Sequence, residues 1–431
     1  MYGDDWTFPP WTRQESDTRK NQTVSGIYYG RSWATRVASA GRAADVQKGT
    51  MVDAAELTAK LKGEAHRLGF DLAGACPAQS PPGLVHFRRW LAAGHAGEMA
   101  YFARRSRAYE HPRHVLPQAQ SLLVLGMNYR TSEPAAVCSG QGRVSRYAWG
   151  SADYHDLVRQ RLRRLAAFHR RLTPEASVRG VVDTAPLLER DFARLAGLGW
   201  IGKNTLLLNR HLGSWFFLAV LLTSETLDYD EPTSVGSCGS CQACLDACPT
   251  GALVGPYQLD ARRCVSYLTI ELRGWPLDGD PRRIGKWVFG CDACQEVCPW
   301  NRRTRASGEP AFQPRPDLNP VRLAKMLCLD EASYKARFRR TPLIRPKRSG
   351  LLRNAAVVTA NNPSPASLQA LSRGLNDPDA VIRCACAWAI GRTGARHAHT
   401  ALRDRMERED DPAARREIRE SLDALAKAGA S

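Results

Sequence analysis

Apolar residues recur along the chain in two patterns, one typical of buried strands and one typical of amphipathic helices. Short apolar runs bounded by turn residues predict buried strands, at residues 70–75, 121–126, 178–182 and 215–222. Apolar positions at helical spacing predict helices, at residues 57–68, 90–105 (with a glycine break) and 157–165. Strands and helices that mix in this order predict a layered α/β or α+β domain over residues 51–225.

The two ends of the chain depart from this pattern. Residues 1–50 carry no clear periodicity, so we expect a disordered or appended segment, with translation starting at Met1 or Met51. Near the other end, Asp377-Pro378 and Asp411-Pro412 lie 34 residues apart, each at the start of a helical pattern. This spacing is typical of HEAT-like repeats and predicts an α-helical repeat domain over residues 351–431. A single helical hairpin is the alternative.

Between these regions, over residues 226–310, cysteines have a spacing typical of iron–sulfur ligands. The first run is Cys238-x-x-Cys241-x-x-Cys244-x-x-x-Cys248-Pro249. It matches the bacterial two-cluster ferredoxin motif, in which the fourth cysteine binds the other cluster. The second run is one ligand short and reads Cys291-x-x-Cys294-x-x-x-Cys298-Pro299. Cys264 is the only cysteine between the two runs and supplies the missing ligand.

The crossover rule divides these eight thiolates between two 4Fe-4S clusters. The first group is Cys238, Cys241, Cys244 and Cys298, and the second group is Cys248, Cys264, Cys291 and Cys294. Structural zinc is the alternative, but its usual spacing pairs two C-x-x-C units across a longer loop. Here three ligands lie within seven residues, so the sequence favours iron–sulfur clusters in a ferredoxin-like domain.

Charge and composition narrow the choice of partners and compartment. The 431-residue chain has a formal net charge of +18 and a pI near 9.6, which favours a polyanionic partner such as nucleic acid. Basic runs flank or lie in an expected basic linker at 311–350. The alternative is a basic surface that binds no nucleic acid. No apolar run is long enough to span a membrane and no signal peptide is visible, so we expect a reducing cytoplasm.

Two residues outside the cysteine runs have a candidate chemical role. Asp183 lies between apolar residues, so burial is expected to raise its pKa toward the range useful for a general acid. The alternative is an ordinary N-cap aspartate between a strand and a helix. Lys203, in the glycine-rich turn 197–204, is a candidate contact for an anionic cofactor group, or else keeps that turn solvated.

Together with the cysteine runs, several longer stretches resemble the epoxyqueuosine reductase family over essentially all of the chain from Met51 onward. These stretches lie at residues 90–101, 149–156, 182–184, 197–204, 263–269 and 290–301. The resemblance implies a cobalamin-binding catalytic domain at 51–225, a two-cluster domain at 226–310 and a repeat domain that clamps an anticodon stem. It also implies reduction of epoxyqueuosine to queuosine at the wobble position of a tRNA.

The same resemblance implies roles for individual residues. Asp183 occupies the position of the family's proton donor. The cofactor contacts that it implies are Ser145, Asp183, Lys203, Leu207 and Ser266, where Ser145 stands at a position that is cysteine in some relatives. One departure is Tyr109, which replaces a family arginine; Arg107, two residues before it, is the candidate for that contact.

Two other functions compete with this one. A corrinoid reductive dehalogenase acting on a small organohalide is the closest enzymatic alternative, because the core resembles that class as well. A non-catalytic iron–sulfur protein that binds tRNA or carries electrons is the alternative from another class. For the reductase we expect a cytoplasmic monomer supplied by an unidentified low-potential electron donor.

Overall fold

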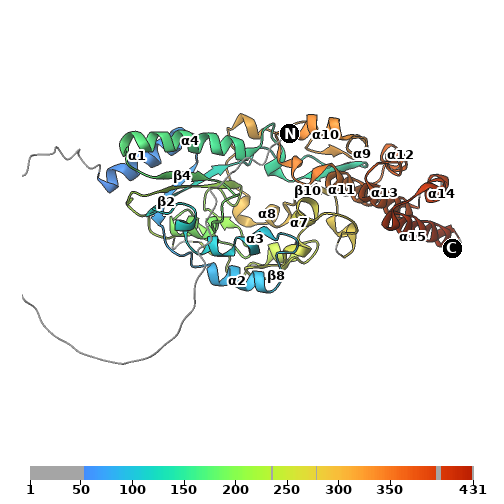
Figure 1. The fold of residues 1–431 in the computed structure, drawn as a ribbon, viewed down its shortest axis with the longest axis horizontal. Helices are drawn as coiled ribbons and strands as arrows, with labels where there is room; N and C mark the ends of the chain where they lie inside the picture. Colours follow the sequence, from blue (N-terminus) through green and yellow to red (C-terminus); the bar gives the residue numbers. More distant parts are fainter. Residues whose placement is uncertain (1–52, 234–235, 278, 395–398, 430–431) are drawn as a thin grey trace, which may run out of the picture. The chain divides into compact units, whose positions relative to one another are not determined.

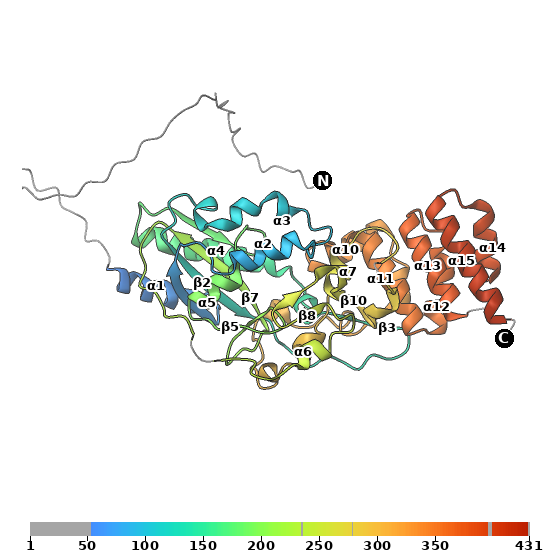
Figure 2. The same cartoon turned by 90° about the horizontal axis from the view of Figure 1, so that it is seen from below.

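The computed structural model describes residues 53–233, 236–277, 279–394 and 399–429, and the chain from Val52 onward packs as one unit (Figures 1 and 2). The expectation of a disordered or appended segment at 1–50 lies outside the described residues, as does the choice between Met1 and Met51. The domain boundaries inside the unit stay predictions.

An antiparallel sheet forms the centre of the first half of the described chain. Its strand order is β1 (Leu72–Pro77), β2 (Ser121–Asn128), β7 (Phe216–Thr223) and β4 (Val178–Val181). Each strand falls on a predicted apolar run, although β1 starts two residues later than expected. Every residue of β2 is buried, which explains why its sequence is a continuous apolar run rather than an alternating one.

Helices cover both faces of this sheet. Helices α1 (Ala54–Arg67) and α4 (Tyr154–Leu172) pack on one face, where Leu61 and Leu162 share an apolar cluster with Leu123 of β2. Figure 1 shows these two helices side by side above the strands. Helix α5 (Glu189–Leu195) packs on the other face, where Phe192 joins Val124. The layered mixed α/β architecture is therefore confirmed.

The helix expected at 90–105 differs from the prediction. Two helices, α2 (Leu84–Ala92) and α3 (Tyr101–Arg104), replace it. Between them Gly94 and Gly97 have φ values of 67° and 57°, a left-handed conformation that ends the first helix. The glycine break was predicted, but the start of the first helix at Leu84 was not.

The cysteine-rich region consists of short elements around the cysteines. These are the hairpin β5 (Trp200–Ile201) and β6 (Leu207–Leu208), α6 (Ala243–Asp246), the hairpin β8 (Leu253–Gly255) and β9 (Gln258–Leu259), α7 (Val265–Ile270) and α8 (Ala293–Glu296). A further sheet has the order β10 (Trp287–Phe289), β3 (Gln141–Val144) and β11 (Val321–Arg322). It joins segments from three parts of the sequence.

Residues 311–350 were expected to be a basic linker, and the structure differs. They include α9 (Leu323–Leu327) and α10 (Glu331–Phe338). Met326, Phe338 and Leu343 are buried in one apolar cluster with residues of the repeats. The segment is packed core, because these apolar side chains are removed from water. Arg339 and Arg340 remain exposed, whereas Arg348 is largely buried against Asp377.

The C-terminal part is a stack of helices, as the repeat spacing predicted. The helices are α11 (Lys347–Asn361), α12 (Pro365–Gly374), α13 (Ala380–Thr393), α14 (His399–Arg408) and α15 (Pro412–Gly429). Helix α13 packs against both α11 and α15, and Figure 2 shows these helices next to one another. Within the described residues, no helix is both long and apolar enough to cross a membrane.

Candidate iron–sulfur centres and active site

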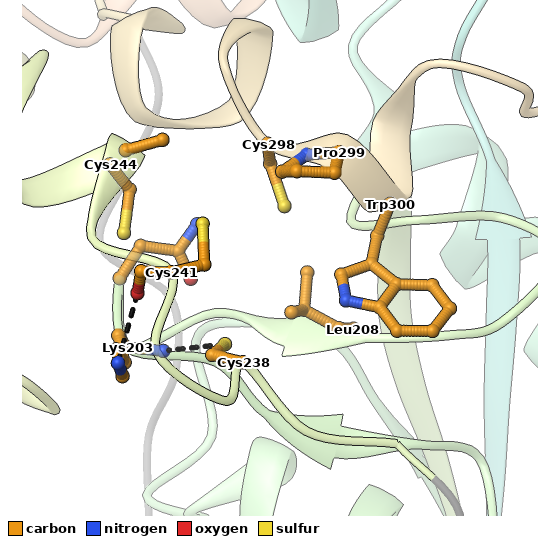
Figure 3. Close-up of a pocket in the computed structure, with 10 residues that line it drawn as sticks. Lys203, Leu208, Cys238, Cys241, Cys244, Cys298, Pro299 and Trp300 are labelled. Carbon is orange, nitrogen blue, oxygen red and sulfur yellow. Dashed lines mark hydrogen bonds between the residues drawn. The ribbon is translucent and has the colours of Figure 1, made fainter.

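The first group of cysteines lines a small cavity of about 50 Å³. Figure 3 shows the sulfur atoms of Cys238, Cys241, Cys244 and Cys298 arranged around a common space. Leu208 and Trp300 contribute apolar wall, and Trp200 packs edge-on against Trp300 with ring centroids 4.8 Å apart. The fold therefore brings together the four thiols that spacing assigned to one cluster, and their role as ligands stays a prediction.

Lys203 lies on the wall of this small cavity and is absent from the described lining of the larger cavity. Its Nζ donates hydrogen bonds to the carbonyl oxygens of Gly239 (2.7 Å) and Cys241 (2.9 Å). Its backbone N–H points at the sulfur of Cys238 at 3.4 Å. Lys203 thus fixes the loop that carries the first two thiols. The contact with cobalamin that the family resemblance implies for Lys203 stays a prediction.

The second group of cysteines lines a larger cavity, of about 400 Å³. Its thiols belong to Cys248, Cys264, Cys291 and Cys294. Gly290, directly before Cys291, has a φ of 66°, and a Cβ atom there would lie 2.5 Å from the Cβ of Ser145. Only glycine allows this approach, which places the second group against the segment that follows β3.

The thiol geometry also bears on the choice of metal. All thirteen cysteines lie in the described ranges, and none forms a disulfide. Among the described residues, no three Cys, His, Asp or Glu side chains converge closely enough to hold a single metal ion. A zinc ion needs its thiolates at about 2.3 Å, whereas a 4Fe-4S cluster spreads four ligands over a larger body. The preference for clusters over zinc rests on the cysteine spacing.

Asp183 faces the larger cavity from the segment that follows β4. Its φ of 49° is left-handed, a conformation that aspartate adopts more readily than most residues. The Tyr154 hydroxyl donates a short hydrogen bond to Oδ2 of Asp183, and Nε2 of His155 lies 3.4 Å from the same oxygen. The N-cap alternative is wrong, because α5 begins only at Glu189 and its N-cap residue is Leu188.

The pKa of Asp183 corrects the sequence-based expectation. Burial raises the pKa of this carboxyl, but hydrogen bonds from His155 and Tyr154 outweigh burial and hold the pKa below its ordinary value. Asp183 is therefore ionised near neutral pH. Burial lowers the pKa of His155, but Asp153 and Asp183 outweigh it and raise the pKa to about 9. Burial, together with the charge of Asp183, raises the pKa of Glu189 well above its ordinary value.

The other predicted cofactor contacts divide between the cavity and the surface. Ser145, Leu207 and Ser266 line the larger cavity with Asp183. The hydroxyl of Ser145 donates a short hydrogen bond to Asp292, the residue after Cys291, so it is already engaged. Arg107 is exposed in the turn at 106–110 and is absent from the described lining of both cavities. Nothing in its position supports the predicted contact, which stays a prediction.

Sequence reasoning missed several residues around Asp183. Tyr154 and Glu189 line the same cavity, and His155 reaches Asp183 from the start of α4. A signal was present, because the run 153–156 combines titratable and aromatic residues at a helix start. Oε1 of Glu189 and Nδ2 of Asn204 are buried and find no hydrogen-bond partner among the described residues. An unpaired acceptor and donor on a cavity wall suit a bound group with polar edges.

Family models match three parts of the chain. Residues 237–301 match the 4Fe-4S double cluster binding domain, residues 110–184 match Epoxyqueuosine reductase QueG, DUF1730, and residues 345–423 match HEAT repeats. The chain is therefore an iron–sulfur protein with a double-cluster domain between a mixed α/β layer and helical repeats.

Whole-chain comparisons specify the family. An epoxyqueuosine reductase of Pseudomonas aeruginosa is 42% identical over 348 residues, which cover 79% of this chain and 96% of the relative. The Escherichia coli enzyme of the same name is 36% identical over 345 residues, 79% of this chain and 90% of the relative. A crystal structure of epoxyqueuosine reductase with an epoxyqueuosine-modified tRNA-Tyr stem loop has a TM-score of 0.79 and 31% identity, and covers 86% of this chain and 99% of that one. The chain belongs to the epoxyqueuosine reductase family, which is a family of oxidoreductases.

Proposed function

We propose that this chain reduces epoxyqueuosine in the anticodon wobble position of a tRNA to queuosine, using two 4Fe-4S clusters and cobalamin. One observation carries the proposal: the thiols of the second group and the carboxylate of Asp183 line the same cavity. A one-electron carrier then lies beside a group that handles protons. Reductive removal of oxygen from carbon needs both in one place.

The overall reaction fixes what the site must supply. Both C–O bonds of the epoxide break, a C=C bond forms between the two carbons, and the oxygen leaves as water. This consumes two electrons and two protons. The electrons come one at a time from a low-potential donor. Cys241 of the first group is exposed, so we assign the first cluster to receiving electrons and the second to passing them into the cavity.

The larger cavity fits a corrinoid by the chemistry of its walls. Leu207, Phe216 and Phe217 offer apolar contact to a flat macrocycle. The unpaired atoms of Glu189 and Asn204 would bind the amide groups at a corrin's edge. Cobalamin, if bound there, would supply a low-potential cobalt centre for the reduction. Asp183 then orients the leaving oxygen and delivers a proton to it.

The basic join between the cluster region and the repeats is the proposed tRNA surface. Arg339 and Arg340 are exposed at the end of α10, and among the described residues neither side chain has an ion-pair partner. Arg345 is different, because its guanidinium pairs with Glu271 at 2.6 Å. The free arginines are available to phosphates, as a nucleic-acid surface requires. We further propose a cytoplasmic monomer; the cytoplasm is in keeping with thirteen cysteines that form no disulfide.

An anaerobic single-turnover assay tests this function. Protein loaded with iron, sulfide and cobalamin is reduced chemically and mixed with tRNA that contains epoxyqueuosine. We expect nucleoside mass spectrometry to show queuosine, with the loss of one oxygen atom, only when both cobalamin and reductant are present. Unchanged tRNA after incubation with the fully loaded protein would contradict the proposal. Release of bromide from a bromophenol under the same conditions would favour the dehalogenase alternative.

A further inference from the structure

The proton balance of the proposed reaction is not met by Asp183 alone. Each turnover consumes two protons, and a single carboxyl group carries at most one. The hydrogen bonds of Asp183 moreover keep it ionised near neutral pH. A second group that holds a proton within reach of Asp183 would supply what this carboxylate lacks. This inference rests on the proposed function.

His155 is the residue in position to do so. Its Nε2 lies 3.4 Å from Oδ2 of Asp183, and its Nδ1 lies 2.7 Å from Oδ1 of Asp153. Asp153 is itself fixed as the N-cap of α4, where the same oxygen accepts the backbone N–H of His155 at 3.0 Å. An imidazole with a carboxylate at each nitrogen is arranged to carry two N–H protons.

The ring of His155 is also held in its plane. It stacks on Tyr154 with centroids 4.0 Å apart and an interplanar angle of 26°. Tyr154 in turn stacks on Phe217, a residue of the cavity wall, with centroids 3.9 Å apart and an angle of 3°. The side chain of His155 is 20% exposed, so the imidazole is largely shielded from solvent. Stacking and two carboxylates together leave little freedom of rotation.

We propose that His155 is a positioning residue that stores the proton which Asp183 passes to the leaving epoxide oxygen, and that Asp153 fixes the imidazole for that transfer. The Nε2–H bond of the imidazolium breaks and an O–H bond forms on Asp183. That O–H bond then breaks as the proton passes to the oxygen, which gains negative charge when its C–O bond is reduced. Neutral His155 keeps its Nδ1–H on Asp153 and is recharged by solvent, which supplies the second proton by the same route.

Other charged groups around His155 are consistent with this assignment. From α4 come Asp153 and Arg159, and from the segment after β4 comes Asp183. From α5 come Glu189 and Arg190, which act on Asp183. The two carboxylates in direct contact are the ones that favour the imidazolium, and they raise the pKa of His155 to about 9. His155 is therefore protonated below about pH 9 and loses its proton as the pH rises through that value.

Single-turnover rates of the reduced holoenzyme between about pH 6 and pH 10 test the inference. For the unaltered protein we expect the rate constant to fall as the pH rises through about 9. His155→Gln should lower the rate constant at least about tenfold below that pH and remove the fall. Asp153→Asn keeps the histidine and should move the fall to lower pH, because one of the two carboxylates that favour the imidazolium is neutralised. A merely structural role predicts no such movement.

Matched variants separate the possible outcomes. Asp156→Asn removes a carboxylate three residues from Asp153 whose side chain is 69% exposed, and it should leave rate and pH profile unchanged. Iron content and tRNA affinity show whether each variant folds. If His155→Gln loses its clusters, the pH profile of Asp153→Asn tests the inference instead. A fall near pH 9 that persists in His155→Gln, or one that disappears instead in Glu189→Gln, would overturn the inference. Absence of turnover by the unaltered protein would overturn the proposed function itself.

Discussion

The two cysteine groups share one kind of spacing but lie in different surroundings. The first encloses a cavity of about 50 Å³ whose wall includes Leu208 and Trp300, and Lys203 ties down its loop. The second opens into a cavity of about 400 Å³ that also holds Asp183 and Glu189. The spacing of cysteines determines which thiols meet. Because residues of the α/β layer reach only the second cavity, we propose chemistry at the second group and electron transfer alone at the first.

Removing one ligand from each group should produce the largest effects. Cys264→Ala should lower iron from about eight to about four atoms per chain and abolish single turnover, because its cluster adjoins the cavity. Cys241→Ala should lose the same amount of iron, yet retain single turnover when a small chemical reductant reaches the second cluster directly. Iron analysis and product formation check both variants. Equal loss of single turnover in the two would contradict the division of roles.

Neutralising the carboxylate of the second cavity should have the next largest effect. Asp183→Asn removes the group that delivers the proton, so single turnover should slow by about 100-fold to 1,000-fold. Iron content and tRNA affinity should stay unchanged, because Asp183 touches neither a thiol nor the basic surface. Asp156→Asn, an exposed aspartate near the start of α4, is the control. Full activity of Asp183→Asn would remove this carboxylate from the mechanism.

We propose that the basic surface binds tRNA at a distance from both cavities, so its loss should affect substrate binding alone. Replacing Arg339 and Arg340 by Gln should flatten the dependence of tRNA affinity on salt, by about 0.7 to 0.9 in log–log slope for each phosphate that is no longer neutralised. Turnover of saturating tRNA should be unaffected. Arg282→Gln is the control, because this exposed arginine is paired with Asp280 at 2.9 Å. A slope equal to that of the control would make Arg339 and Arg340 ordinary solvated surface.

Replacing Lys203 should have the smallest effect, and that effect should be confined to the first cluster. Lys203→Met removes a positive charge and two hydrogen bonds from the loop of the first group. The reduced cluster is the more negative state, so we expect its reduction potential to fall by on the order of tens of millivolts. The potential of the second cluster should not move. Redox titration followed by electron paramagnetic resonance measures both, with Lys335→Met, at an exposed lysine of α10, as control. A shift confined to the second cluster would reverse our placement of Lys203.

Features with a local cause were predictable from the sequence. The strand β2 is apolar from Leu122 to Met127 because it is buried on both faces, and the continuous apolar run in the sequence indicates this. The grouping of cysteines followed from motif spacing alone. The core position of residues 311–350 was hidden, because prolines and arginines interrupt the apolar positions of that stretch, although those apolar side chains decide its packing.

Features that depend on interactions between distant segments were not predictable. Asp183 was singled out, but its pKa direction was not, because hydrogen bonds from residues 28 and 29 positions before it outweigh burial. Lys203 likewise binds carbonyl groups 36 and 38 residues further along the chain. A sequence gives the identity of such groups, and only the fold gives the partner that sets the charge state.

The most direct test of the difference between the two groups is the electron paramagnetic resonance spectrum of the cobalamin-loaded protein, poised so that the cobalt is Co(II) while the clusters are reduced. We predict that the cobalt signal is broadened by the spin of a nearby cluster. The broadening should persist in Cys241→Ala and disappear in Cys264→Ala. A broadening that disappears in Cys241→Ala and persists in Cys264→Ala would place the reaction beside the first group and contradict the assignment made from the cavities.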